Sequence, residues 1–394
     1  MRCKRPARSS EDHALPSRRE ALRTMGLFGA ALAAAPESAL PLSWFQEGDQ
    51  VIPFTDVPTD FSTRRGELVF RLDLRELRSW LTPTEEFFSV AHYDRPQVDA
   101  STWSLSVSGF VENPMSLTLD EIEKLPRVEK TLTFECSGNQ ASRIHGMVGN
   151  ATFAGTPLKD LLDRAMPSGD VIEVAFWAAD KGKEKIRDNE YEQNFARAMS
   201  IEDAMNEGAI LAYEMNGEPL SFLHGYPLRL IVPGWYGIAN VKWLERIELN
   251  DRRLMNRFMG RDYVTIIGRE VDGKMQWFER SVTRQRVKSA IARVTKTASG
   301  RTKVFGVAWT DGAGLDSVEV RIDAGSWQKA ELDDRGNPYA WTFFTLTTDP
   351  LAAGDHALVS RAKDRKGRTQ PENLDTKKTY WEDNAQFKRT IAVT

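Results

Sequence analysis

The sequence predicts an α+β protein of two domains, of which the second is a β-sandwich. Between residues 81 and 278, strand-like alternating segments are interspersed with short stretches whose apolar residues recur at helical spacing. From 279 to 394 the pattern changes to short alternating strands separated by turn sequences. About 360 residues remain after an N-terminal leader is removed, which is long for a single hydrophobic core and also favours two domains.

Residues 1–35 are typical of an export signal. A basic leader is followed by a short apolar run, 25–35, that ends in three alanines suited to a signal peptidase. The run is too short to span a bilayer, which takes about 20 apolar residues. Arg18 and Arg19 resemble a twin-arginine signal, which exports folded proteins and predicts a periplasmic protein. A chance arginine pair in an ordinary leader is the alternative.

The composition argues against nucleic acid and membranes as partners. The formal net charge of the chain is −3, and the leader removes more basic than acidic residues when it is cut away. A mildly acidic protein has no electrostatic field that attracts DNA or anionic lipid. Beyond the leader, no stretch of the sequence reaches membrane-spanning length, so no membrane span is predicted.

The individual elements follow from local patterns. Residues 36–80 are irregular and rich in proline, and we expect an extended arm that lies on the body of the protein. In the first domain, strands are predicted at 103–107, 131–134, 171–177 and 228–232, and helices at 119–125, at 158–165 and from residue 200 onward. In the second, strands are predicted at 291–294, 303–309, 318–323, 340–346 and 356–364, a spacing typical of an immunoglobulin-like β-sandwich. The domain boundary is predicted near 278–286.

Without the leader, the chain has a single cysteine, Cys136. A lone thiol cannot form an internal disulfide, so it is a buried structural residue, a nucleophile or a metal ligand. The run Phe134-Glu135-Cys136-Ser137-Gly138-Asn139 places it after a strand and within turn residues, which are not typical of a core. A thiolate is a soft anionic ligand, and Gly138 lets the backbone approach a metal closely. The pattern favours a metal ligand.

Four segments in order resemble the sulfite oxidase family of molybdenum enzymes. They are Phe-Phe-Ser-Val-Ala-His at 87–92, the cysteine run at 134–139, Leu-Ala-Tyr-Glu-Met-Asn-Gly to His-Gly-Tyr-Pro-Leu-Arg at 211–229, and Val-Pro-Gly-Trp-Tyr-Gly to Asn-Val-Lys-Trp-Leu at 232–244. The resemblance covers nearly all of the mature chain. It implies a sulfite oxidase-type molybdopterin-binding catalytic domain at 81–278 and, at 279–394, the β-sandwich that dimerises in this family, and therefore a homodimer.

The resemblance also implies roles for individual residues. Cys136 would bind molybdenum, and the remaining sulfur ligands would come from the molybdopterin. Tyr213 matches the active-site tyrosine, where a phenol assists proton movement; an ordinary core aromatic is the alternative. Arg229 suits a phosphate, because its planar and always charged fork matches phosphate oxygens. The cofactor contacts implied are His92, Asp180, His224, Arg229, Asn240, Val241 and Lys242. His145 and His356 match no motif and are expected to be ordinary hydrogen-bonded residues.

Two positions depart from the family pattern. Sulfite oxidases have an arginine two residues before the first histidine and another three residues before the final lysine, where this chain has Val90 and Ala239. Each such arginine contributes about 1.5–3 kcal/mol of charge-assisted contacts to an anionic substrate. Arg143, just after the cysteine run, is another cation that could reach the substrate. Sulfite is therefore the first expectation for the substrate, but the sequence does not fix it.

The function implied is that of an exported oxidoreductase that catalyses oxygen-atom transfer on a small oxyanion or sulfur-containing substrate, like a sulfite dehydrogenase. The sequence has no Cys-x-x-Cys-His haem motif, iron–sulfur spacing or glycine-rich nucleotide loop, so haem, flavin and NAD are not expected. Electrons would leave to a separate carrier, by family analogy a c-type cytochrome. The alternatives are a reductase of sulfoxides or other oxo substrates and a non-catalytic member of the family.

Overall fold

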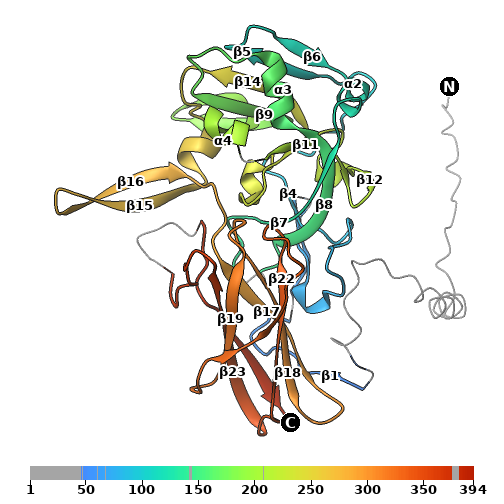
Figure 1. Cartoon of the computed structure of the whole chain (residues 1–394), viewed down its shortest axis with the longest axis vertical. Helices are drawn as coiled ribbons and strands as arrows, with labels where there is room; N and C mark the ends of the chain where they lie inside the picture. Colours follow the sequence, from blue (N-terminus) through green and yellow to red (C-terminus); the bar gives the residue numbers. More distant parts are fainter. Residues whose placement is uncertain are drawn as a thin grey trace, which may run out of the picture.

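The computed structural model describes residue 46 and residues 48–59, 61–66, 68–141, 144–206, 208–374 and 381–394. The predicted leader at 1–35 and Arg143 lie outside the described residues. Two bodies are stacked along the long axis of the molecule, and a long hairpin projects from the region between them (Figure 1). In the part of the chain that is described, no helix has both the length and the apolar character needed to cross a membrane.

The first body is built on two five-stranded sheets. One has the order β10 (Asn189–Ser200), β9 (Glu173–Ile186), β14 (Leu244–Asn250), β5 (Leu105–Gly109) and β6 (Met115–Leu117). Its strands pair antiparallel except β5 and β14, which are parallel. The other has the order β12 (Glu218–Pro219), β11 (Ile210–Met215), β8 (Val148–Pro157) and β7 (Val128–Glu135), and β13 (Arg229–Ile231) also pairs with β11.

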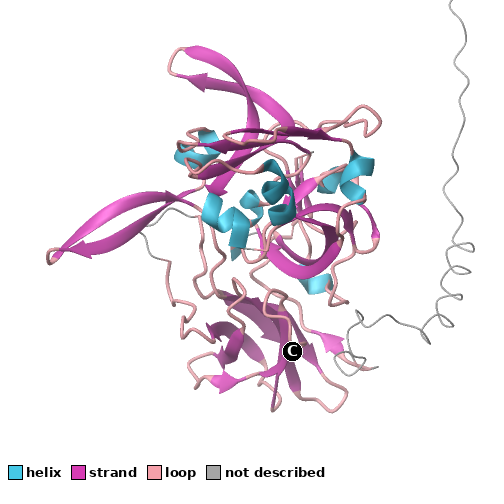
Figure 2. Ribbon diagram, turned by 45° about the horizontal axis from the view of Figure 1, so that its top comes forward, coloured by secondary structure: helices cyan, strands magenta, loops and turns pink. Residues whose placement is uncertain are grey.

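Three short α-helices accompany these sheets in the described residues, namely α2 (Leu119–Glu123), α3 (Leu158–Ala165) and α4 (Ile201–Asn206). Each lies where the sequence predicts a helix. Thr118 and Glu121 form a capping box that starts α2, and α3 buries Leu158, Leu161 and Leu162 on one face. Strands dominate all the same (Figure 2), so the predicted α+β class holds only in the coarser sense of a mostly β domain with few helices. Of β9 and β10, the sequence predicted only a strand at 171–177. The polar residues on either side of the β9–β10 turn lack the apolar alternation by which the rest of these strands could have been predicted.

The second body consists of two antiparallel sheets. One has the order β1 (Gln50–Val51), β17 (Lys288–Lys296), β18 (Thr302–Trp309), β22 (Thr342–Thr348) and β21 (Glu331–Asp333). The other has the order β20 (Gln328–Lys329), β19 (Leu315–Ile322), β23 (Gly354–Asp364) and β24 (Lys388–Val393). Val304 and Phe344 from the first sheet pack in one fully buried cluster with Val318 and Leu358 from the second. Such a shared core is typical of two sheets packed face to face.

The N-terminal arm lies against the second body. Its strand β1 pairs with β17, and Phe54 forms a bridge to Ile391 of β24. The arm continues through β2 (Arg64–Arg65), β3 (Val69–Phe70), which pairs with β4 (Ser89–Val90), and the 3-10 helix η3 (Leu74–Glu76). From residue 48 onward, the described part of this segment is mostly irregular and pairs with the second body only through short strands and bridges.

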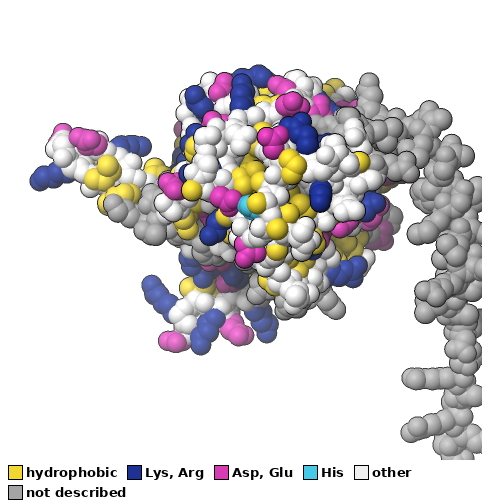
Figure 3. All heavy atoms as spheres, turned by 90° about the horizontal axis from the view of Figure 1, so that it is seen from below, with side chains coloured by type: hydrophobic (Ala, Val, Ile, Leu, Met, Phe, Trp, Pro, Cys, Tyr) yellow, Lys and Arg dark blue, Asp and Glu magenta, His cyan; other side chains and the backbone are white. Residues whose placement is uncertain are grey.

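The projecting hairpin consists of β15 (Val264–Val271) and β16 (Lys274–Ser281). It crosses the region where the sequence places the end of the first domain. Met275, Trp277 and Phe278 are exposed on it, and Figure 3 shows apolar side chains along its middle and charged ones at its tip. The hairpin follows directly on η7 (Arg257–Arg261), a π-helical turn; the 3-10 helices η5 (Phe222–His224) and η6 (Gly237–Ala239) lie earlier in the chain.

Candidate cofactor site

A cavity of about 600 Å³, its open mouth included, lies in the first domain. All four motif segments of the sequence contribute to its wall. Of the predicted site residues, it brings together Cys136, His92, Asp180, His224, Arg229, Asn240 and Lys242.

Cys136 reaches the cavity because strand β7 ends one residue before it. The Cys136 amide donates to the carbonyl of Met147 at 2.9 Å, and its carbonyl accepts from the Asn139 amide at 2.9 Å, which closes a tight turn. Cys136 is a partly exposed residue and forms no disulfide. A side chain placed at the rim of a turn, and not within a strand, leaves its sulfur accessible to a ligand in the cavity.

Arg229 is a buried cation without a neutralising acid. Its Nη1 donates to the carbonyl of His224 at 2.9 Å and its Nη2 to the carbonyl of Asn240 at 3.1 Å. Its Nε has no hydrogen-bond partner, and no carboxylate of the described residues forms an ion pair with it. Burial lowers the pKa of Arg229 to about 9. A cation held in this way is complementary to an anionic group that enters the cavity.

Lys242 provides a second basic group in the cavity. Its Nζ donates to Ser89 Oγ at 3.2 Å and to the carbonyl of Leu223 at 3.3 Å, and it lies 4.1 Å from the centre of the Trp243 ring. Enclosure of the ammonium group lowers the pKa of Lys242 well below its usual range, and the neighbouring Arg229 adds to this effect. The loop that carries His224 approaches Lys242 so closely that a Cβ at Gly225 would lie 2.9 Å from the Lys242 Cβ. Glycine, with a φ of +104°, permits this approach.

The two predicted histidines are neutral donors or acceptors. His92 Nε2 lies 2.7 Å from the hydroxyl of Tyr263, and His224 Nε2 donates to the carbonyl of Thr84 at 2.9 Å. Burial, and then the nearby cations, lowers the pKa of each imidazole to about 3. Burial also raises the pKa of Asp180 to about 7, although Lys242 opposes the shift. The histidines therefore add no positive charge to the cavity wall at neutral pH, and its other basic groups are Arg229 and Lys242.

Asn240 acts as a brace for the loop around Arg229. Its Oδ1 accepts from the amide of Val232 at 2.7 Å, its Nδ2 donates to the carbonyl of Tyr236 at 3.1 Å, and its own carbonyl accepts from Arg229. The side chain thus fixes both ends of the turn that leads to Lys242. This geometry explains why an amide side chain suits the position.

The structure does not bring Tyr213 or Val241 to the cavity wall. Both side chains pack in the hydrophobic core of the first domain, where Tyr213 is 5% exposed and Val241 1%. Side chains alternate along β11, so Ala212 packs in the cluster that contains Phe134, whereas Tyr213 points into the other cluster. For Tyr213, the alternative of an ordinary core aromatic fits its position.

The phenol that does line the cavity is that of Tyr263. It follows η7 directly, it hydrogen-bonds to His92, and it stacks on Trp381 with ring centres 4.1 Å apart. Sequence reasoning missed it because it belongs to no motif. At the two substituted positions, Val90 lines the cavity, whereas Ala239 is buried in η6 and is not part of the lining.

These residues fit a molybdopterin. Among the described residues, no group of three or more His, Cys, Asp or Glu side chains is placed to hold a metal ion. A lone Cys136 is compatible with an organic cofactor that brings further metal ligands of its own. The unpartnered Nε of Arg229 and the absence of a described carboxylate beside it match the phosphate of such a molecule. Fold and site together define a molybdopterin-binding oxidoreductase.

Comparison with known protein families leads to the same class. The oxidoreductase molybdopterin binding domain matches residues 92–258, and the Mo-co oxidoreductase dimerisation domain matches residues 280–393. The chain belongs to the sulfite oxidase family of molybdopterin-dependent oxidoreductases. The family assignment made from the four sequence segments is thereby confirmed.

Individual relatives show how far the similarity extends. Sulfite oxidase of Arabidopsis thaliana is 28% identical over 337 residues, which cover 76% of this chain and 84% of that protein. Mitochondrial sulfite oxidase of Homo sapiens is 31% identical over 324 residues, which cover 75% of this chain but 58% of that protein. The sulfane dehydrogenase SoxCD of Paracoccus pantotrophus has a similar fold, with a TM-score of 0.69, 23% identity, and coverage of 93% of this chain and 95% of that one.

Proposed function

We propose that this protein is an exported oxidoreductase that uses a molybdenum cofactor to oxidise a small sulfur compound. The observation that carries the proposal is the meeting of Cys136 with the unneutralised Arg229 in one cavity. When bound, the cofactor supplies the two-electron redox and oxygen-atom-transfer chemistry. The chain supplies a thiolate ligand, an anchor for the phosphate, and a wall that orients the substrate.

Specific side chains take distinct parts in this function. Arg229 and Lys242 would hold the anionic end of the cofactor, and the neutral His92 and His224 would offer it hydrogen bonds. Tyr263 presents a phenol to the cavity while its hydroxyl shares a hydrogen bond with His92. The neutral imidazole would hold the phenol in position, and the phenol hydroxyl would hydrogen-bond to a substrate in the cavity.

Sulfite is the first candidate substrate, because sulfite oxidases of plants and animals are among the relatives. A second candidate is a less charged sulfane sulfur, the substrate class named for the structurally similar enzyme from Paracoccus. The observation in its favour is Val90, which lines the cavity together with aromatic side chains. Sulfite carries two negative charges, and an apolar wall does not compensate them.

The remaining parts of the proposal concern location and partners. The twin-arginine-type leader supports export to the periplasm, and the family's dimerisation domain supports a homodimer. Without a haem motif in the sequence, electrons would pass to a separate carrier, and a c-type cytochrome is the proposed one.

The test is the metal content and activity of protein exported in native form. We expect about one molybdenum per chain, reduction of an added c-type cytochrome by sulfite or by a sulfane compound, and loss of both in Cys136→Ala. Methionine sulfoxide serves as the comparison substrate. Full metal content in Cys136→Ala would refute the role of the thiolate, and activity with the sulfoxide alone would favour a reductase.

A further inference from the structure

The turn that carries Cys136 is held by the second domain. Glu135 lies immediately before the cysteine, and its side chain is 1% exposed. Its Oε1 accepts from Lys288 Nζ at 2.7 Å, and its Oε2 accepts from Trp309 Nε1 at 3.0 Å. Lys288 belongs to β17 and Trp309 to β18, so both donors come from the other body of the molecule.

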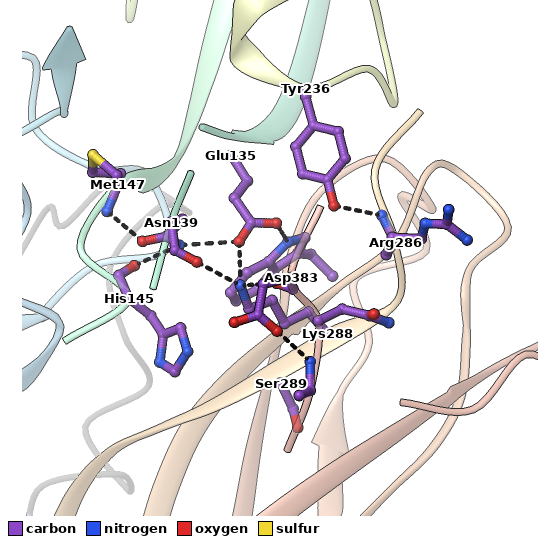
Figure 4. Close-up of polar contacts among 12 residues, drawn as sticks. Glu135, Asn139, His145, Met147, Tyr236, Arg286, Lys288, Ser289 and Asp383 are labelled. Carbon is purple, nitrogen blue, oxygen red and sulfur yellow. Dashed lines mark hydrogen bonds and ion pairs between the residues drawn. The ribbon is translucent and has the colours of Figure 1, made fainter. Parts of the chain in front are cut away.

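Lys288 completes the attachment from the other side. Besides Glu135, its ammonium donates to the carbonyl of Asn139 at 3.0 Å and to the carbonyl of Asp383 at 2.7 Å (Figure 4). An ammonium group has three hydrogens, and each has an acceptor here. The two loop residues that Lys288 binds, Glu135 and Asn139, lie on either side of Cys136, so this one side chain spans the base of the turn.

A third attachment is made by the backbone. The carbonyl of Ser137 accepts from the amide of Glu382 at 2.9 Å. The carboxylate of Glu382 is in turn paired with Arg286 at 2.8 Å and with Arg280 at 3.4 Å. Positions 135, 137 and 139 of the turn are therefore all bonded to residues beyond 280, which the dimerisation-domain family covers.

We infer that the Glu135–Lys288 pair is a positioning device, through which the second domain sets where the Cys136 thiol stands in the cofactor cavity. The inference rests on the proposed role of Cys136 as the metal ligand. It assigns the second domain a task in the active site in addition to subunit contact. Loss of the pair should release the turn and loosen the cofactor even in a chain whose domains remain folded.

The test replaces Lys288 by methionine, which keeps length but removes the charge. A matched control is Arg293→Met: Arg293 lies on the same strand, is also buried, and donates to carbonyls of the N-terminal arm at Arg75 and Leu77 instead of the cysteine turn. A second variant, Glu135→Gln with Lys288→Met, removes the unpaired carboxylate that the single change leaves behind.

The first readout does not need the cofactor. In full-length chain from a host that makes no molybdopterin, the alkylation rate of the Cys136 peptide should rise about tenfold in Lys288→Met and change by less than about twofold in Arg293→Met. The double variant should lie between them. Equal rates in Lys288→Met and Arg293→Met would overturn the inference.

The second readout is molybdenum per chain, together with the electron paramagnetic resonance signal of the metal. Lys288→Met should lose metal about tenfold relative to Arg293→Met, and the metal that remains should give an altered signal. Unchanged metal and signal would also overturn the inference. If the unaltered protein holds no more metal than Cys136→Ala, the proposed function fails, while the alkylation rates still decide the positioning role.

Discussion

Two buried cations of this protein have opposite surroundings. Lys288, at the contact between the domains, donates to the carboxylate of Glu135 and to two carbonyls, so its charge is neutralised and its donors are used. Arg229, in the cavity, donates to carbonyls only, and its Nε has no partner. Burying an unpaired charge costs stability. The contrast indicates that Lys288 stabilises the fold, whereas Arg229 is placed to bind an anionic ligand.

Paired buried charges and groups with perturbed pKa values are also found in different parts of the molecule. In the second domain, the buried Arg389 is paired with Asp56 of the arm at 2.8 Å. In the cavity of the first, Asp180 has a pKa raised to about 7, and two histidines have pKa values lowered to about 3. Perturbed groups that gather in one cavity are typical of a functional site. The two histidines and Asp180, together with the unneutralised Arg229, therefore mark this cavity as the candidate site.

The largest expected effect concerns the neutralised cation. Lys288→Met should lower the free energy of unfolding of the cofactor-free chain by about 3–5 kcal/mol, because it leaves Glu135 buried without a counter-charge. The double variant with Glu135→Gln should recover most of this loss. Chemical denaturation monitored by tryptophan fluorescence measures both. A loss below about 1 kcal/mol would mean that the pair is not the buried ion pair described here.

The opposite result is expected for the uncompensated cation. Arg229→Met should leave the unfolding free energy of the cofactor-free chain unchanged or raise it, because an unpaired buried charge is removed. Binding of the cofactor should weaken by about 1.5–3 kcal/mol, which is roughly a tenfold to hundredfold loss of affinity. Pterin fluorescence per chain after dialysis measures the retention. Strong destabilisation of the cofactor-free chain together with full pterin retention would remove the distinction between Arg229 and Lys288.

The sequence predicted the surroundings of Arg229 but not those of Lys288. Cys136, His224 and Arg229 stand in contiguous motifs, so their meeting in a cavity could be predicted from the resemblance. Glu135 and Lys288 are 153 positions apart, and neither belongs to a periodic or spaced pattern that would pair them. Contacts of this kind depend on how two complete domains pack, which local sequence does not encode.

The fold, too, was predicted where it depends on local sequence and was not predicted where it depends on tertiary contacts. Helix α3 and strand β18 were predicted almost to the residue, because apolar periodicity is a local property. For Tyr213 the motif implied a place in the active site, but a β-bulge in the β11–β8 pairing interrupts the register between Ala212 and Glu214. Which face a side chain takes at such a site follows from the partner strand. Tyr263 lacks any motif, so its place beside His92 follows from the tertiary structure alone.

A smaller effect is expected from the histidines of the cavity. The unfolded chain takes up a proton at His92 near pH 6.5, whereas in the folded chain burial lowers the pKa to about 3. Stability is therefore lost as pH falls through this window, by about 1.4 kcal/mol per unit for each such group. Asp180, whose pKa is raised to about 7, has the opposite slope between pH 4 and 7.

His92→Gln should therefore flatten the acid loss of stability, and Asp180→Asn should steepen it. Glutamine retains a hydrogen-bond partner for the hydroxyl of Tyr263 but does not titrate. Unfolding free energies of the cofactor-free chain at several pH values between 4 and 7 measure the slopes. If the unfolding free energy has the same pH dependence in the unaltered chain and in His92→Gln, the His92 imidazole is not buried and its pKa is not lowered.

The smallest effect tests the charge that the cavity wall lacks. Val90→Arg adds a guanidinium where sulfite oxidases carry one, on a partly exposed side chain, so the gain for sulfite should be about 1 kcal/mol, or roughly a fivefold lower KM. Val90→Gln has similar bulk without charge and should leave KM for sulfite nearly unchanged. A sulfane substrate of lower charge should gain little from either variant. If Val90→Arg lowers KM for both substrates equally, the apolar wall does not select the substrate, and the discrimination must reside elsewhere in the cavity.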